Sequence, residues 1–325
     1  MIRYLIAVFI FAFAGTFANG QPVGAIAPSA AVVPQSNAEF PGKPELLRRI
    51  GLYEAAARKA ETAHTDRKSL VKIYANLGGL YEDAAMYPKA EDAMLRAISL
   101  LRAGPQDELA EEIGHLAVLH VAMGELREAE RNQMEALAIR ESVGDPTGIA
   151  LTWNDLADLY IKNRQYKKAL DYAQRAMRVL ADRPDVGASD RIAVRQTLAF
   201  ALCGTGNCEK AIPLLKDALE LSKSSFGADS LPVGIDEYLL GYAYWQSGNL
   251  HDAAEWMGQG IARMKVDLGW GHTIYVNALR QYAKFLQKTG QTEAAASADI
   301  EVHQAEALVD ARSFTKRPDT FRSTE

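Results

Sequence analysis

The chain has 325 residues, and its 48% hydrophobic, 24% charged and 8% aromatic content suits one large fold or two ordinary domains and excludes disorder throughout. The 36 Lys and Arg against 41 Asp and Glu leave a formal net charge of −5, so no overall positive field draws the chain to DNA or RNA. A mean hydropathy of −0.14 excludes a polytopic membrane protein.

The first 20 residues have the pattern of an export signal. Arg3 supplies a positive charge, residues 4–13 form an uninterrupted apolar run, and small residues follow over 14–20. We expect cleavage after Ala18 or Gly20 and a periplasmic or secreted product. The alternative is an uncleaved anchor, but the apolar stretch is shorter than the roughly 20 residues that span a bilayer. We therefore expect no stable membrane insertion of the mature chain.

Residues 21–43 predict a linker, because Pro, Ala, Gly, Val and Ser dominate them and almost no charge or helical period occurs. Residues 45–64 predict a helix that covers one end of the domain that follows. Its apolar positions at helical spacing are Leu46, Leu47, Ile50, Tyr53 and Ala57. Residues 313–325 have no sustained apolar face and predict a flexible tail.

Between these ends the sequence repeats itself about every 42 residues. The clearest marker is an alanine that recurs at intervals of 39 to 42 residues: Ala90, Ala129, Ala169, Ala211, Ala253 and Ala295. A bulky residue precedes each marker by 13 positions: Leu77, Leu116, Leu156, Leu198, Leu240 and Tyr282. A small residue follows each bulky one: Gly78, Ala117, Ala157, Ala199, Gly241 and Ala283. This spacing predicts two helices per repeat, A and B, which meet closely at the small residues.

A turn is predicted between helices A and B of every repeat. Glycine occupies it at Gly124, Gly206, Gly248 and Gly290, and Ala85 and Arg164 stand there in the other two copies. Glycine ends a helix in a left-handed conformation without a steric penalty. A second small or β-branched residue lies seven positions after each marker: Ala97, Ala136, Ala176, Ala218, Gly260 and Val302.

These residues resemble the tetratricopeptide repeat family, with repeats as long as those of kinesin light chains. The third copy matches that pattern best, through Trp153, Leu156, Ala157, Tyr160, Ala169 and Ala176. Arg195 and Leu279 depart from it at the tryptophan position of the fourth and sixth copies. The resemblance implies an all-α, right-handed solenoid over 44–312 with helix A on its concave side. Its six hairpins are expected over residues 71–102, 110–141, 150–181, 192–223, 234–265 and 276–312.

No catalytic, metal or cofactor motif emerges from the rest of the sequence. The six histidines show no i, i+4 pair and no cysteine nearby, and no P-loop or nucleophile elbow occurs. Cys203 and Cys208 flank the turn of the fourth repeat, where two interpretations stay open. An oxidising compartment would permit a disulfide between them, and otherwise both would be small buried hydrophobes.

In this family ligands bind in the concave groove. The residues at the matching positions of helix A are therefore candidate site residues in this chain. They are Asn154, Asp158, Phe200, Tyr238, Tyr242, Trp245, Arg280, Lys284 and Lys288. Tyr238, Tyr242 and Trp245 share one helical face and are either peptide anchors or packing residues. Arg280, Lys284 and Lys288 form a basic stripe that either binds acidic groups or is simply solvated.

The resemblance predicts a non-catalytic scaffold that holds a peptide or helix of another protein, with no nucleic acid and no cofactor. One alternative is a self-associating structural element of the cell envelope, which would make a homo-oligomer. The other is an enzyme whose site is dispersed over several helices.

Overall fold

The computed structural model describes residues 43–63, 66–269 and 272–312. Those residues form thirteen α-helices and no strand. The export signal, most of the linker and the tail predicted above lie outside the described residues. The helices are α2 (Lys43–Thr62), α3 (Arg67–Asp83), α4 (Tyr87–Leu101), α5 (Gln106–Met123), α6 (Leu126–Val143), α7 (Pro146–Lys162), α8 (Tyr166–Leu180), α9 (Ala188–Gly204), α10 (Cys208–Phe226), α11 (Leu231–Gln246), α12 (Leu250–Leu268), α13 (Thr273–Lys288) and α14 (Thr292–Arg312).

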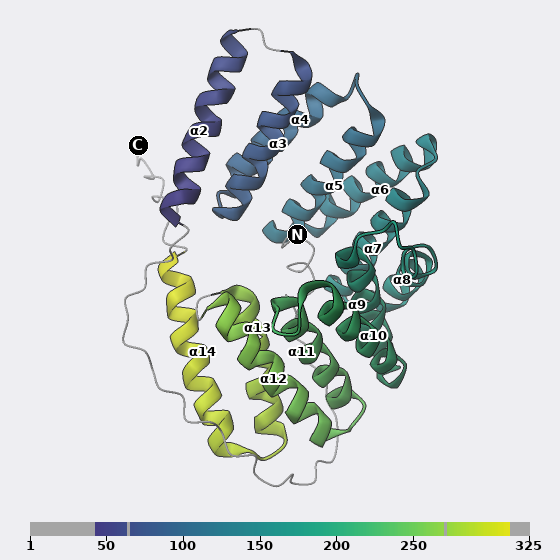
Figure 1. The fold of residues 1–325 in the computed structure, drawn as a ribbon, viewed down its shortest axis with the longest axis vertical. Helices are drawn as coiled ribbons and strands as arrows, with labels where there is room; N and C mark the ends of the chain where they lie inside the picture. Colours follow the sequence, from purple (N-terminus) through teal and green to yellow (C-terminus); the bar gives the residue numbers. More distant parts are fainter. Residues whose placement is uncertain (1–42, 64–65, 270–271, 313–325) are drawn as a thin grey trace, which may run out of the picture. The chain divides into compact units, whose positions relative to one another are not determined.

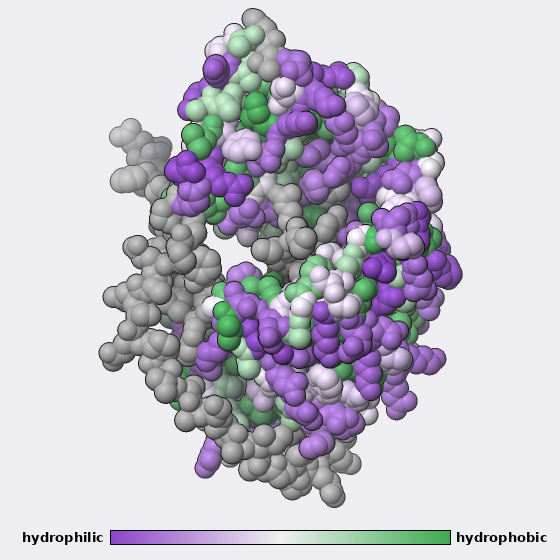
Figure 2. Space-filling model, viewed as in Figure 1, coloured by the Kyte–Doolittle hydropathy of each residue, from purple (hydrophilic) through white to green (hydrophobic). Residues whose placement is uncertain are grey.

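The helices fall into two compact units that divide at Gly187. We call α2–α8 the N-terminal unit and α9–α14 the C-terminal unit (Figure 1). In each unit, helices consecutive in the chain pack against one another, and each contains three hairpins of an A helix followed by a B helix. Polar residues cover most of the face seen in Figure 2, and apolar residues are scattered among them. The predicted all-α solenoid of six hairpins with an extra N-terminal helix is confirmed.

All six turns between helices A and B have the same backbone conformation. Positive φ angles occur at Ala85 (55°), Gly124, Arg164 (56°), Gly206, Gly248 and Gly290, which are the six predicted turn residues. The next residue donates its backbone N–H to the carbonyl oxygen five positions earlier, from Met86 to Tyr81 at 2.8 Å and from Gln165 to Tyr160 at 2.8 Å. This six-to-one hydrogen bond satisfies a carbonyl that the end of the helix would otherwise leave unpaired.

The small residues of the repeat lie where the two helices of a hairpin meet. Five of the six marker alanines have no exposed surface, and Ala295 is 3% exposed. At Gly241 and Gly260 the α11 and α12 backbones approach so closely that a side chain has no room. A Cβ on Gly260 would lie 2.5 Å from the carbonyl oxygen of Gly234 and 2.8 Å from Cβ of Tyr238. These glycines are therefore requirements of packing.

The two residues that depart from the repeat pattern are accommodated in the core. Arg195 is 9% exposed and donates from Nη1 to the carbonyl oxygen of Arg191 at 2.7 Å, one turn earlier on α9. Leu279 is 2% exposed. The fourth and sixth hairpins therefore form despite lacking tryptophan at this position.

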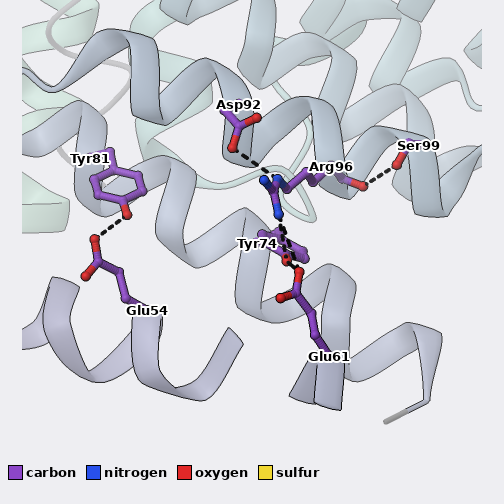
Figure 3. Close-up of polar contacts among 7 residues, drawn as sticks. All are labelled: Glu54, Glu61, Tyr74, Tyr81, Asp92, Arg96 and Ser99. Atoms are coloured by element: carbon purple, nitrogen blue, oxygen red, sulfur yellow. Dashed lines mark hydrogen bonds and ion pairs between the residues drawn. The ribbon is translucent and has the colours of Figure 1, made fainter. Parts of the chain in front are cut away.

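Helix α2 covers the start of the first hairpin through two tyrosine–glutamate contacts that lie side by side along the helix (Figure 3). Tyr81 donates its hydroxyl hydrogen to Glu54 Oε1 at 2.7 Å, and Tyr74 donates to Glu61 Oε1. Arg96 on α4 approaches the same Glu61 at 3.4 Å. Burial and the Glu54 carboxylate raise the pKa of Tyr81 to about 12, so this tyrosine stays a donor throughout the ordinary pH range.

We predict that replacing Tyr74 and Tyr81 together by phenylalanine loosens α2 without unfolding the hairpins. Each hydrogen bond contributes about 1 kcal/mol, so the loss of both should let the amide protons of α2 exchange up to about 30-fold faster in hydrogen-exchange measurements. Tyr87→Phe on α4 is the matched control, because no hydrogen bond of that hydroxyl is found in the described part of the chain. Unchanged exchange of α2 in the double variant would show that apolar burial alone holds this helix.

Candidate functional site

Four aromatic rings from three successive A helices contact one another in the C-terminal unit. The ring centroids of Phe200 on α9 and Tyr242 on α11 lie 6.1 Å apart, and those of Tyr242 and Trp245 lie 5.9 Å apart. Trp245 then meets Phe285 on α13 edge to face, at 5.5 Å. We call Phe200, Tyr242, Trp245 and Phe285 the aromatic row. Three of its members, Phe200, Tyr242 and Trp245, are predicted site residues, and Phe285 is the fourth.

Exposure differs sharply among these aromatic side chains. Tyr238 is 4% exposed, Tyr242 is 7% exposed and Phe285 is fully buried, whereas Phe200 and Trp245 are half-buried. Burial raises the pKa of Tyr238 well above the ordinary tyrosine range. Tyr238 is therefore a packing residue and not an exposed peptide anchor. Tyr242 is mainly a support for its neighbours, and Phe200 and Trp245 are the members open to solvent.

A cavity beneath the aromatic row is too small to hold a ligand. Its volume of about 10 Å³ corresponds to roughly one water molecule. It is lined by Ala199, Phe200, Cys203, Leu215, Leu239, Tyr242 and Ala243. Any ligand of the aromatic row must therefore lie on the surface of the A helices.

The three residues of the basic stripe have different surroundings on α13. Arg280 donates to Glu306 Oε1 on α14 at 2.6 Å and to Asn277 Oδ1 at 2.7 Å, so its charge is compensated. Lys288 is exposed, and its Nζ lies 5.6 Å from the centre of the Trp245 ring. Lys284 lies between them in the sequence and is half-buried. The stripe therefore borders the aromatic row through Lys288.

The acidic residues of α11 lie inside the hairpin core. Asp236 is fully buried and accepts hydrogen bonds from Gln196 Nε2 at 2.7 Å and from the Ser222 hydroxyl. Burial raises the pKa of Asp236 to about 7. The neighbouring Glu237 is 4% exposed and accepts from Arg263 Nε on α12 at 3.2 Å. Neither carboxylate offsets the positive charge of α13 at the aromatic row.

Asn154 and Asp158, also predicted as site residues, belong to a polar cluster on α7 of the N-terminal unit. Asp158 is 9% exposed and pairs with Lys162 Nζ at 3.3 Å. Asn154 is 8% exposed, and its Oδ1 has no hydrogen-bond partner in the described structure. Burial raises the pKa of Asp158, and that of Asp155 to about 7. The sequence interpretation missed the half-buried Asp155, because helical spacing gives no sign of how far neighbouring helices withdraw a carboxylate from water.

Cys203 and Cys208 form a disulfide across the turn between α9 and α10, with Cα atoms 4.2 Å apart. Cys203 also lines the small cavity below Phe200 and Tyr242. Among the described residues, no group of three His, Cys, Asp or Glu side chains is placed to hold a metal ion. The same residues include no helix long and apolar enough to cross a membrane.

Stacked α-helical hairpins with a shared turn and small residues at each contact define an α-helical repeat solenoid. Residues 110–182 and 190–265 match the family model described as tetratricopeptide repeat. These two stretches are tetratricopeptide repeats. A stretch of 187 residues is 25% identical to the human protein named Clustered mitochondria protein homolog, covering 54% of this chain and 14% of that protein. The chain thus spans only a small part of this relative's length.

Solved structures share the fold at low sequence identity. The TPR-like repeats of a Podosopora anserina protein named for kinesin light chain match with 17% identity over 63% of this chain and 99% of that chain, with a TM-score of 0.51. The apo form of RapI matches at 14% identity over 82% and 93%, with a TM-score of 0.66. The Rap conjugation gene regulator of plasmid pLS20, solved in complex with the Phr* peptide, matches at 14% over 86% and 73%, with a TM-score of 0.64. These likenesses establish the fold.

Proposed function

We propose that this protein is a non-catalytic scaffold that holds a peptide or helix of another exported protein against the A helices of its C-terminal unit. The observation that carries this proposal is the aromatic row, with Phe200 and Trp245 half-buried at the surface and Tyr242 and Phe285 buried behind them. Partly exposed aromatic side chains held by a rigid layer are typical of the few residues that supply most of the binding free energy in an interface.

The buried rings favour binding because they fix the exposed rings in advance. Trp245 meets Tyr242 on one side and Phe285 on the other, both edge to face. A side chain that is already ordered loses little conformational entropy when a partner binds, so more of the contact free energy remains as affinity. A Rap protein of the same fold has been solved with a peptide, which is consistent with a peptide ligand for this chain.

A second candidate function is self-association through the first helix. Leu47 and Leu52 on α2 are 48% and 55% exposed, which is unusual for leucine at the end of a repeat array. Analytical ultracentrifugation over a hundred-fold concentration range tests it. A constant monomer mass would exclude this alternative.

The main proposal is tested by replacing Trp245 with alanine. We expect the parent protein to recover a specific partner from envelope and secreted extracts, and the variant to recover at least about ten-fold less of it, as for loss of one interface hot spot. Tyr242 is unsuitable for this test, because it is buried and its loss would disturb the fold.

Trp256→Ala is the matched control, since Trp256 is also half-buried but lies on the B helix α12. Circular dichroism should show equal helix content in all three proteins. Equal recovery of the partner by parent and Trp245→Ala would place binding elsewhere on the molecule and contradict the proposal.

A further inference from the structure

We infer that helix α8 of the N-terminal unit binds the surface of an anionic phospholipid bilayer through its exposed cations. These cations are Lys167, Lys168, Arg175 and Arg178, and all four side chains are exposed. The surface belongs to a B helix of the other unit, so the inference goes beyond the proposed function and does not depend on the aromatic row. Such a contact holds the folded repeats at a bilayer without inserting them.

Charge distinguishes α8 from the other B helices. It contains four basic residues and one acidic residue. The B helices α4, α6, α10, α12 and α14 each contain at least as many acidic as basic residues. The whole chain has a formal net charge of −5, so the positive charge of α8 is a local feature that no other B helix shares.

The cations of α8 follow one face of the helix, and most of them have no counterion. Lys168, Asp171, Arg175 and Arg178 are three or four residues apart, so they line up along the helix, and Lys167 lies beside them. Asp171 pairs with Arg175 at 2.8 Å. No ion pair of Lys167, Lys168 or Arg178 occurs among the residues that the structure describes. Three positive charges therefore remain over a length of about 16 Å.

Two stacked tyrosine rings support part of this charged face. The ring centroids of Tyr160 on α7 and Tyr172 on α8 lie 5.6 Å apart. Lys168 Nζ lies 4.9 Å from the centre of the Tyr160 ring, and the guanidinium carbon of Arg175 lies 5.6 Å from that of Tyr172. Tyr160 donates its hydroxyl hydrogen to Glu130 Oε1 at 2.6 Å, which fixes the ring. Cations ordered in this way lose less conformational entropy when they bind an anion.

An anionic bilayer fits this face better than an acidic protein does. None of the large hydrophobic residues that are exposed in the described part of the chain lies on α8. A protein partner draws most of its binding free energy from a few well-packed anchors, which this face does not offer. A bilayer rich in acidic lipid attracts each nearby basic residue by charge alone. The contact is therefore at the headgroups, and salt weakens it.

Co-sedimentation with vesicles of phosphatidylcholine, with and without about one third phosphatidylglycerol, tests the inference at low ionic strength. The full chain is compared with Lys167→Glu/Arg178→Glu, which we call the α8 variant. The matched control is Lys210→Glu/Lys216→Glu, because it makes the same change of charge at two exposed lysines on the B helix α10. Circular dichroism should show equal helix content in all three proteins.

We expect the parent and the control to bind more tightly to the vesicles that contain phosphatidylglycerol, and salt to release them. The α8 variant should lose at least about 20-fold of this added affinity, since each basic residue near an anionic surface contributes about five-fold. Adsorption through the apolar run over residues 4–13 is measured by the vesicles of pure phosphatidylcholine.

Acetylation of lysine side chains locates the contact on the molecule. Lys167 and Lys168 should react several-fold more slowly with acetic anhydride when vesicles containing phosphatidylglycerol are present. Lys210 on α10 should react at the same rate with and without vesicles. This measurement stays informative even if the apolar run holds every variant on the vesicles.

Added affinity for phosphatidylglycerol that the α8 variant retains would overturn the inference, as would equal binding of the parent to both kinds of vesicle. Labelling of Lys167 and Lys168 that acidic vesicles leave unchanged would overturn it too. Tighter binding of the parent to polyglutamate than to acidic vesicles of equal total charge would assign the face to an acidic protein instead. None of these outcomes bears on the aromatic row, which Trp245→Ala tests separately.

Discussion

Replacing Gly241 with alanine should destabilise the C-terminal unit by about 3 kcal/mol, because the added methyl group has no space. A Cβ at this position would lie 2.6 Å from Met257 Cγ and 3.0 Å from the carbonyl oxygen of Ala253, and closer still to the backbone nitrogen of Met257. A side chain can rotate away, but backbone atoms on α12 cannot move without separating the two helices. Thermal unfolding followed by circular dichroism measures the loss.

Two other helical glycines serve as graded controls. Gly114 on α5 has open space where a methyl group would be added, so Gly114→Ala should stabilise the N-terminal unit by roughly 0.5 kcal/mol through better helix propensity. At Gly78 the nearest atom is Met94 Cγ at 2.7 Å, on a flexible side chain, so a smaller loss than at Gly241 is expected. Equal effects at all three positions would contradict the packing argument.

The Asp236→Asn variant should gain stability relative to the parent as the pH rises from about 4 to about 7. The pKa of Asp236 is raised from 3.8 to about 7 by burial. Between these two values the folded protein holds a proton that the unfolded chain releases, so the unfolding free energy of the parent falls with rising pH. Asparagine does not titrate, and the difference should grow by roughly 4 kcal/mol across this range and then level off.

Urea unfolding of parent and variant at pH 4, 5.5, 7 and 8.5 measures this difference directly. Taking the difference removes the contributions of other titrating groups, such as Asp190 on α9, whose pKa is also raised by burial. A difference that stays constant with pH would mean that Asp236 is ionised in the folded protein, held by the hydrogen bonds from Gln196 and Ser222.

The repeat architecture could be predicted from the sequence because it depends on residues that are close together in the chain and regularly spaced. The marker alanines and the turn residues follow from residue size and from glycine at fixed intervals, and such local signals survive without any alignment. The helix at the start was expected at residues 45–64 and is found at Lys43–Thr62. Differences of two residues at helix ends are usual, since helix ends fray.

The candidate site was predictable only in part, because exposure depends on the neighbouring repeat. Phe200 and Trp245 are half-buried, whereas the packing of adjacent helices buries Tyr238 and Tyr242, and helical spacing does not distinguish the two pairs. Phe285 was missed because its position in its own helix looks like an ordinary core residue. The pairing of Arg280 with Glu306 joins two helices, so no pattern within α13 could reveal that one of three similar cations is already neutralised.

The six turns keep a left-handed backbone conformation throughout this chain, although the residue that adopts it changes from repeat to repeat. Ala85 and Arg164 hold the same left-handed conformation as the four glycines, although L side chains adopt it at a cost of roughly 1 kcal/mol. The six-to-one hydrogen bond and the packing of two helices outweigh that cost in both repeats. Repeats of this kind can therefore differ in sequence at the turn between helices A and B and still keep the same hairpin geometry. A hairpin could be added to such an array, or removed from it, without a change in the other turns.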